Sequence, residues 1–432
     1  MKHNKFWAAV GKTLAAVTVM LVVTLMLVSG AGAASKYKVL HRFNEYGYQH
    51  PDGTSPYGGL ILDAAGNLYG TTAHGWGSDC YWNGCGSVFE LTPNPDGTWT
   101  ENNLSDVFFD TDYGSWPMAS VIFDAAGNLY GTASGDYTCC GIVFQGAPQP
   151  DGSWKWTTLH SFTGGTDGST PFAELILDTS GNLYGTTVLG GAYGNGVVFE
   201  LTPNPDGTWT ETTLYSFTGG KDGAHPQSGL IFDATGKLYG TTAYGGLPGC
   251  VGSGCGTVYT LTASGGRWKE KVLHRFSGGK DGGLPTARVI FDAAGNLYST
   301  AESGGAYGYG VVFELIPNPD GSWKEKVLHQ FKGGKDGANP WPALVLDGTG
   351  NLYGTTYNGG PYGYGTVFKL TLGTDGIWRE SMLHAFKGQP ARNPYAGLTL
   401  DAAGNLYGVT VGGDQDCSWW QNDCGAVFEI TP

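Results

Sequence analysis

One ten-residue phrase recurs along the chain and sets the main limit on how it can fold. It first occurs as DAAGNLYGTT, from Asp63 to Thr72. Its opening aspartate returns at six further positions: Asp124, Asp178, Asp233, Asp292, Asp347 and Asp401. The repeats are therefore 54 to 61 residues long. Repeats of about this length are typical of β-propeller blades, whereas the coils of a parallel β-helix are much shorter.

Each repeat predicts four antiparallel strands. An apolar run such as residues 60–62 predicts an inner strand that is buried on both faces. A D-x-x-G-N turn leads to the second strand, L-Y-G-T-T, because Gly and Asn accept the positive φ of a tight hairpin. A third strand such as residues 88–91 and a charged fourth strand such as residues 268–276 complete the unit. No stretch shows sustained helical periodicity.

The ends of the chain predict how the repeats close into a ring. Residues 38–43 have the pattern of a fourth strand, and residues 427–430 have the pattern of a third strand. The last repeat lacks the one strand that the N-terminal segment supplies, and pairing the two removes the open sheet edge. We therefore predict an all-β fold, a seven-bladed β-propeller formed as one domain by residues 35–432.

Residues 1–34 have the pattern of a Sec-type signal peptide. Lys2, Lys5 and Lys12 precede an apolar run over residues 14–28, and Ala31-Gly32-Ala33 supplies a small-residue cleavage site. The alternative, an uncleaved anchor, is disfavoured because the run is short for a membrane span. Hence we expect a secreted or periplasmic protein with no membrane contact after cleavage. The net charge of −14 disfavours nucleic acid and anionic lipid as partners.

The repeats resemble the GloVer tandem-repeat family of bacterial exported proteins, also called the choice-of-anchor family. The matching motifs are D-x-x-G-N-L-Y-G-T-T, G-x-V-F-E-L-T-P and G-G-x-D-G-x-x-P, as in residues 219–226. The resemblance implies an extracytoplasmic propeller of unassigned activity and supplies no catalytic residues. Family members often carry a C-terminal sorting signal; this sequence ends at Pro432 after the last strand, so we expect a soluble protein.

All eight cysteines lie between predicted second and third strands, an even number that predicts disulfides in an exported protein. The expected pairs are Cys80 with Cys85, Cys139 with Cys140, Cys250 with Cys255 and Cys417 with Cys424. A zinc site is disfavoured because the pairs lie in separate repeats. The adjacent pair Cys139-Cys140 requires backbone distortion to bridge. Two free thiols or a crossed pairing are the alternatives there.

Several residue types occupy one repeated position and are interpreted as scaffold. Five histidines share a position in the fourth strand: His41, His160, His274, His329 and His384. Six tryptophans follow the D-G turn and predict blade packing: Trp99, Trp154, Trp209, Trp268, Trp323 and Trp378. Five aspartates share the D-G-x-x-P position: Asp52, Asp167, Asp222, Asp281 and Asp336. Turn capping explains these aspartates, with a calcium site as the alternative. We expect no other metal and no cofactor.

Departures from the repeat indicate functional residues. Alternating strands place two sets of longer loops on one face, here called the upper face, where binding usually resides. Glu174 and Arg288 are the charged residues at the position that opens the inner strand, and Glu302 is charged at the end of a second strand. We predict Arg288 as a ligand-binding residue, and Glu174, Glu302 and Asp136 as candidate catalytic acids. The alternative is a structural Arg288–Glu302 salt bridge.

Aromatic residues gather in the upper loops of blades 7, 1 and 2, which adjoin through ring closure. They are Trp419, Trp420, Trp76, Tyr81, Trp82, Trp116 and Tyr137. Aromatic faces accompanied by carboxylates suit sugar rings, whose C–H faces stack and whose hydroxyls form hydrogen bonds. The alternative is that these loops merely pack on one another.

We therefore predict a binding or interaction module, acting as a monomer, for a glycan or another extracellular polymer. The alternative is an extracellular carbohydrate-active enzyme, a glycoside hydrolase or polysaccharide lyase, which would use paired acids at the channel mouth. A quinone-dependent dehydrogenase is a third hypothesis, prompted only by the adjacent cysteines. The fold itself does not decide among them.

Overall fold

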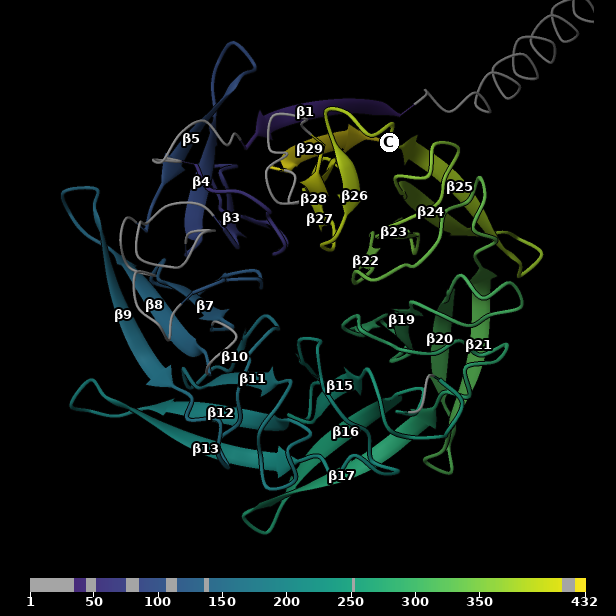
Figure 1. The fold of residues 1–432 in the computed structure, drawn as a ribbon, viewed down its shortest axis with the longest axis horizontal. Helices are drawn as coiled ribbons and strands as arrows, with labels where there is room; N and C mark the ends of the chain where they lie inside the picture. The colour runs from purple at the N-terminus through teal and green to yellow at the C-terminus, as the bar shows by residue number, and fades with distance from the viewer. Residues whose placement is uncertain are drawn as a thin grey trace, which may run out of the picture.

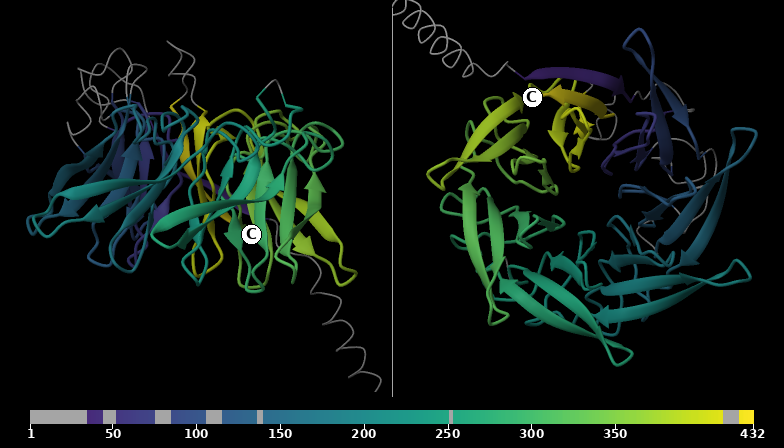
Figure 2. Two further views of the ribbon diagram at one scale, coloured as in Figure 1. Left: turned by 90° about the horizontal axis from the view of Figure 1, so that it is seen from below. Right: turned by 180° about the vertical axis from the view of Figure 1, so that it is seen from behind.

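The structure is a computed structural model that describes residues 35–43, 52–74, 85–105, 115–135, 140–250, 253–413 and 424–432. These residues form seven antiparallel sheets arranged around a central axis (Figure 1). Turned on its side, the ring is a flat body with the blades standing side by side (Figure 2). The predicted seven-bladed, all-β propeller is confirmed. Within the described segments, no helix is long and apolar enough to cross a membrane.

The blades are numbered 1 to 7 in the order of their inner strands. In that order the inner strands are β2 (Ile61–Leu62), β6 (Ile122–Phe123), β10 (Ile176–Leu177), β14 (Ile231–Phe232), β18 (Ile290–Phe291), β22 (Val345–Leu346) and β27 (Thr399–Leu400). The second strands are β3 (Leu68–Thr72), β7 (Leu129–Ala133), β11 (Leu183–Thr187), β15 (Leu238–Thr242), β19 (Leu297–Ala301), β23 (Leu352–Thr356) and β28 (Leu406–Gly412).

The two outer positions of each blade hold longer strands. The third strands are β4 (Ser87–Pro93), β8 (Ile142–Pro148), β12 (Val197–Pro203), β16 (Thr257–Ser264), β20 (Val311–Pro317), β24 (Thr366–Leu372) and β29 (Ala426–Thr431). The fourth strands are β5 (Trp99–Asn103), β9 (Trp154–Ser161), β13 (Trp209–Ser216), β17 (Arg267–Arg275), β21 (Trp323–Gln330), β25 (Trp378–Ala385) and, for blade 7, β1 (Lys36–Arg42).

The inner strands are only half-buried, so the prediction that they are buried on both faces is wrong. In blade 1, Leu60 is buried but Ile61 and Leu62 are not. In six of the seven blades, a residue of the inner strand lines the axial cavity; β14 of blade 4 contributes none. Apolar side chains therefore line that cavity.

The hydrophobic core lies between adjacent blades. The aromatic residue after one fourth strand packs edge-to-face on the aromatic residue of the next third strand, as Phe276 does on Phe313 at 5.1 Å between centroids. In six of the seven repeats a glycine of the second strand lies opposite the ring of the third strand, and Ser299 takes this place in blade 5. A Cβ on Gly70 would lie 2.5 Å from Cζ of Phe89. This close approach explains why the phrase keeps a glycine inside a strand.

The tyrosine of the same phrase links each blade to the next. Tyr184 of blade 3 packs against Trp268 of blade 4 at 6.5 Å between ring centroids. The Tyr184 hydroxyl lies between two carboxylates, 2.7 Å from Glu200 Oε1 and 3.2 Å from Asp178 Oδ2, and donates its hydrogen bond to them. The second carboxylate oxygen of Asp178 caps its own turn. The repeated tryptophans are thus blade-packing residues, as predicted.

The N-terminal strand closes the ring. β1 pairs antiparallel with β29, from Lys36 opposite Thr431 to Arg42 opposite Ala426. The purple β1 lies along the yellow β29 in Figure 1. The closure confirms the prediction made from the two chain ends, because the outer strand of blade 7 comes from the opposite end of the sequence.

Blade 7 carries one strand beyond the predicted four. β26 (Arg392–Pro394) pairs with β28, with Arg392 opposite Gly412. Blades 1 and 3 to 6 make an isolated bridge at this place, such as Ser169 with Leu189. Blade 7 has no D-G-x-x-P aspartate, and its entry segment runs extended along the second strand instead.

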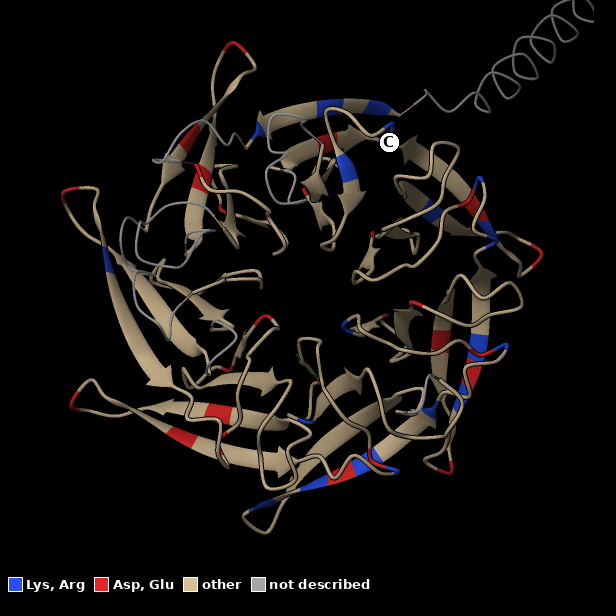
Figure 3. Cartoon of the chain, viewed as in Figure 1, with Lys and Arg blue, Asp and Glu red and all other residues tan. Residues whose placement is uncertain are grey.

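Titratable groups repeat at the outer blade interfaces. The fourth-strand histidine lies near the D-G-x-x-P aspartate, with 3.3 Å between His329 Nε2 and Asp336 Oδ2. A fourth-strand glutamate of the next blade approaches the same aspartate, and burial, followed by repulsion from Asp336, raises the pKa of Glu380 to about 7. Charged residues otherwise occupy mainly the outer strands and hairpin tips (Figure 3). Few charges therefore remain near the axis.

Candidate functional site

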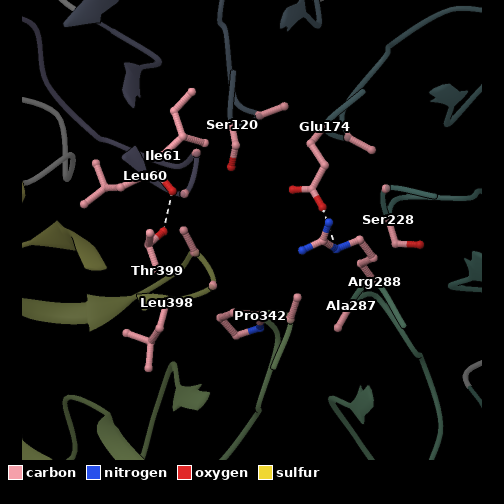
Figure 4. Close-up of a pocket in the computed structure, with 18 of the residues that line it drawn as sticks. Leu60, Ile61, Ser120, Glu174, Ser228, Ala287, Arg288, Pro342, Leu398 and Thr399 are labelled. Atoms are coloured by element: carbon pink, nitrogen blue, oxygen red, sulfur yellow. Dashed lines mark hydrogen bonds and ion pairs between the residues drawn. The ribbon is translucent and has the colours of Figure 1, made fainter. Parts of the chain in front are cut away.

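A cavity of about 820 Å³ lies at the axis of the ring, on the upper side of the inner strands. Two residues from every blade line it: the residue after the repeated proline and the residue two positions later. The first set is Tyr57, Met118, Phe172, Gln227, Thr286, Trp341 and Tyr395. The second set is Gly59, Ser120, Glu174, Gly229, Arg288, Ala343 and Gly397. Figure 4 shows side chains from several blades converging on it.

A repeated backbone conformation positions the first set. The residue before each proline has a positive φ of 53° to 64°, in the order Ser55, Trp116, Thr170, His225, Leu284, Asn339 and Asn393. Such a conformation is uncommon for residues other than glycine. Its side chain can tie one blade to the preceding one: Asn339 Nδ2 donates to the main-chain oxygen of Glu302 at 3.1 Å. Because all seven blades share this conformation, it is a scaffold feature that fixes the rim.

An ion pair spans part of the channel wall. Arg288 Nε of blade 5 lies 3.0 Å from Glu174 Oε1 of blade 3, and Figure 4 shows the two side chains meeting. They reach each other past blade 4, where Gly229 has no side chain. A Cβ there would lie 2.6 Å from Glu174 Cγ. The proposed Arg288–Glu302 salt bridge is therefore wrong, because Arg288 turns toward Glu174 instead.

Glu302 is the exceptional acid of this cavity. Burial alone raises the pKa of its carboxyl to about 7. Among the residues that the structure describes, no hydrogen-bond or ion-pair partner reaches this carboxyl group. Asn339 instead binds the main-chain oxygen of Glu302. A half-buried carboxyl group without a partner at a cavity wall is typical of a functional site.

Aromatic rings adjoin Glu302 at the cavity rim. Trp341 stacks on Tyr357 with 4.5 Å between centroids, and Tyr395 meets Trp341 edge-on at 5.1 Å. Tyr57 of blade 1 contacts Tyr395 at 4.7 Å. We call Trp341, Tyr357, Tyr395 and Tyr57 the rim cluster. Burial raises the pKa of Tyr395, and the negative charge of Glu302 nearby contributes.

Two polar atoms at this rim are buried without a partner. They are Nε1 of Trp341 and Oγ1 of Thr286. Such atoms usually bind protein, water or a ligand, since leaving one unsatisfied costs about 1–3 kcal/mol. The rim thus offers a donor and a hydroxyl beside the Glu302 carboxyl and the aromatic rings.

The rim cluster was not predicted from the sequence. The signal that would have found it is the residue after the repeated proline, which is aromatic in blades 3, 6, 7 and 1 and polar in blades 4 and 5. Glu174, Arg288 and Glu302, which depart from the repeat as charged residues, all line the cavity.

Most of the predicted aromatic sector lies outside the described residues. This holds for Trp76, Tyr81, Trp82, Tyr137, Trp419 and Trp420, and for the candidate acid Asp136. Trp116 is described: it occupies the position before the repeated proline, with its ring 5.8 Å from that of His74. It does not line the cavity.

The described cysteines are all in disulfides. Cys250 and Cys255 bond to each other in blade 4, with 4.9 Å between Cα atoms. Cys85, Cys140 and Cys424 are also disulfide-bonded. The partners expected for them, Cys80, Cys139 and Cys417, lie outside the described residues.

No cluster of three or more histidine, cysteine, aspartate or glutamate side chains suited to a metal ion occurs within the described ranges. The D-G-x-x-P aspartates, considered above for calcium, bind their own turns. Asp167 accepts from Thr163 N at 2.8 Å and from Thr163 Oγ1 at 2.5 Å. Turn capping thus accounts for their position.

Comparisons with known proteins support the fold. A crystal structure of a protein from Lactobacillus plantarum is similar, with 15% identity and a TM-score of 0.51. The match covers 85% of this chain and 99% of that one. At this identity the likeness shows the fold alone. No curated protein matches the chain.

The family described as the Gloeobacter/Verrucomicrobia repeat matches residues 24–176, 134–251 and 249–432. These matches together cover every blade. They begin before the first described strand and extend to the last residue. The chain therefore belongs to the Gloeobacter/Verrucomicrobia repeat family.

Proposed function

We propose that this protein is an extracytoplasmic binding module that holds a glycan at the upper mouth of its axial cavity. The observation that carries the proposal is the rim of blades 5, 6, 7 and 1. There, aromatic rings, an unpartnered carboxyl group and an unpartnered indole N–H share one cavity wall.

The chemistry of this rim matches that of a sugar. The C–H face of a pyranose stacks on an aromatic ring, and its hydroxyl groups both donate and accept hydrogen bonds. Trp341 supplies a ring and an N–H donor, while Glu302 supplies an acceptor when it is ionised. Gln227 and Thr286 add polar groups on blades 4 and 5. A cavity of about 820 Å³ accommodates a short oligosaccharide.

Exposed tyrosines on the upper loops support a polymeric rather than a monomeric ligand. Tyr307 of blade 5 and Tyr362 of blade 6 are 54% and 52% exposed. Lys332 lies over the first ring at 5.8 Å, and Lys387 over the second at 5.6 Å. They belong to the two blades that carry Glu302 and Trp341. Both lysines follow the outermost strand of their blade, β21 and β25, so these rings would be reached only by a ligand that extends outward from the cavity.

Export is part of the proposal. The pattern of residues 1–34 and the disulfides both fit an oxidising compartment outside the cytoplasm. The family match fits the same location, because the repeat motifs of this chain resemble those of a family of exported bacterial proteins.

The test measures by calorimetry how tightly two tryptophan variants bind neutral β-1,4-linked tetrasaccharides. Trp341→Ala should weaken binding by up to about tenfold, because ring stacking contributes about 0.5–1.5 kcal/mol. The matched control, Trp268→Ala, removes a blade-packing ring and should cost about 3 kcal/mol of stability while leaving affinity nearly unchanged. Equal binding by the parent and by a folded Trp341→Ala protein would contradict the proposal.

One observation favours a carbohydrate-active enzyme as the second candidate. The cavity holds two acids in contrasting surroundings: Glu174 is ion-paired with Arg288, whereas burial raises the pKa of Glu302 to about 7. Acids whose environments differ in this way often divide the roles of general acid and base. Release of reducing sugar by the parent but not by Glu302→Gln would favour catalysis over binding alone.

A further inference from the structure

The charges of the cavity lining restrict which sugar it can hold. Glu174, Arg288 and Glu302 are the charged residues that line it within the described part of the chain. Arg288 and Glu174 neutralise each other at 3.0 Å. The carboxyl group of Glu302 is left without a counter-charge, so the lining carries one net negative charge when Glu302 is ionised.

The position of Glu302 places this charge beside aromatic rings. The side-chain amide of Asn339 donates a hydrogen bond to the main-chain oxygen of Glu302 at 3.1 Å. The main-chain oxygen of Asn339 in turn accepts a hydrogen bond from Tyr357 N at 3.0 Å. Trp341 follows Asn339 by two residues and stacks on Tyr357. Aromatic faces next to a carboxylate attract cations, since the ring face carries a partial negative charge.

We propose that this corner of the cavity binds the ammonium group of an amino sugar. The inference rests on the proposed glycan function and narrows the ligand to a glycan with a free amine. The ammonium would pair with the Glu302 carboxylate, donate hydrogen bonds to it and contact the faces of the rim cluster. The C–H face of the same ring would lie against Trp341.

The cavity corner at Glu302 favours the binding of a cation over the binding of an anion. A sugar carboxylate would face an acid that has no counter-charge, and Arg288, the cation of the described lining, is already paired with Glu174. An N-acetylated amine has no charge, so it forms neither the ion pair nor the cation–π contact. The structure therefore predicts a preference of amine over acetamide and over hydroxyl.

Binding should release a proton. Burial raises the pKa of Glu302 to about 7, so at pH 6 the free carboxyl group is mostly protonated. An adjacent ammonium favours the ionised form and lowers this pKa. The other titratable or charged groups facing the cavity corner are Glu174, Arg288, Tyr57, Tyr357 and Tyr395. Burial raises the pKa of both Tyr357 and Tyr395, so neither hydroxyl releases a proton at pH 6.

The experiment uses three β-1,4-linked tetrasaccharides that differ only at carbon 2, which bears an amine, an acetamide or a hydroxyl. Calorimetry of the mature protein at pH 6 in buffers of different ionisation enthalpy measures affinity and proton release together. We expect the amine form to bind about tenfold more tightly than the others, equivalent to about 1.4 kcal/mol, with release of close to one proton.

Glu302→Gln should abolish both the preference and the proton release while residual binding remains. Glu325→Gln, at an outer blade interface, is the matched control and should keep both. Equal affinities for the three sugars in the parent, or no proton release, would overturn this inference but leave the glycan function intact. The proton count is measured on the parent, so the test does not depend on the variant folding. Failure of all three sugars to bind would contradict the proposed function and this inference with it.

Discussion

Gly229 allows charged side chains from two non-adjacent blades, blades 3 and 5, to form an ion pair. Glu174 and Arg288 both project from inner-strand openings, and the blade between them presents a glycine. Any larger residue at that place would meet the Glu174 side chain within 2.6 Å. The ion pair removes Arg288 from the vicinity of Glu302 and leaves that acid without a partner. The character of the cavity therefore depends on the absence of one side chain.

Titratable residues at the outer blade interfaces are predicted to make the free energy of unfolding depend on pH. Burial, followed by repulsion from Asp281, raises the pKa of Glu325 to about 7. A carboxyl group with a raised folded-state pKa stabilises the fold below its unfolded pKa, and this contribution is lost as the pH rises through about 7. Glu325→Gln should therefore increase the free energy of unfolding by about 1 kcal/mol at pH 8, after allowance for solvent screening.

The same substitution should change stability little at pH 5, where the Glu325 carboxyl group is already protonated. Denaturant unfolding at the two pH values measures the difference directly. Histidines such as His274, whose pKa is lowered by burial, shift stability in the opposite sense, so the comparison must be between variant and parent at each pH. Equal effects at pH 5 and pH 8 would contradict the assigned pKa shift.

At the scale of strands, β1 is the element on which closure depends. It pairs along its whole length with β29, and Tyr37 stacks on His384 of blade 6 at 3.8 Å between centroids. Deleting residues 36–42 would expose the edge of β29 and leave a solvent-exposed row of main-chain donors and acceptors.

We expect the deletion variant to melt at a lower temperature and to aggregate. Differential scanning calorimetry and light scattering on the purified protein check both expectations. Deleting an equal number of residues that precede the described part of the chain, 21–27, provides the length-matched control. A shortened protein that stays monomeric and as stable as its parent would rule out the closure.

The strand pattern was predictable because it depends on local rules repeated seven times. Turn chemistry, alternation and the two incomplete end repeats predict the blades and their closure. The inner strands were predicted incorrectly as fully buried, because an apolar run such as Ile61-Leu62 does not reveal that one side faces a cavity. β26 was missed because it replaces a turn that blades 3 to 6 keep.

At the scale of the molecule, the site exists only through the ring. Trp341, Tyr395 and Tyr57 are far apart in sequence and meet because blades 6, 7 and 1 adjoin through closure. The sequence predicted the cavity acids as departures from the repeat, yet it paired Arg288 with the wrong one. Hairpin proximity suggested Glu302, while the partner comes from two blades away. Contacts across the axis follow from ring geometry, which no single repeat contains.

The central claim is that the ligand occupies the axial cavity at the rim of blades 5, 6, 7 and 1. A crystal structure of residues 35–432 with the tetrasaccharide that binds most tightly in solution tests it most directly. We predict electron density for a sugar ring against Trp341, with one of its polar groups within hydrogen-bonding distance of the Glu302 carboxyl group. Density for the sugar elsewhere, for instance on the loops of blades 7, 1 and 2, with an empty cavity would contradict the account.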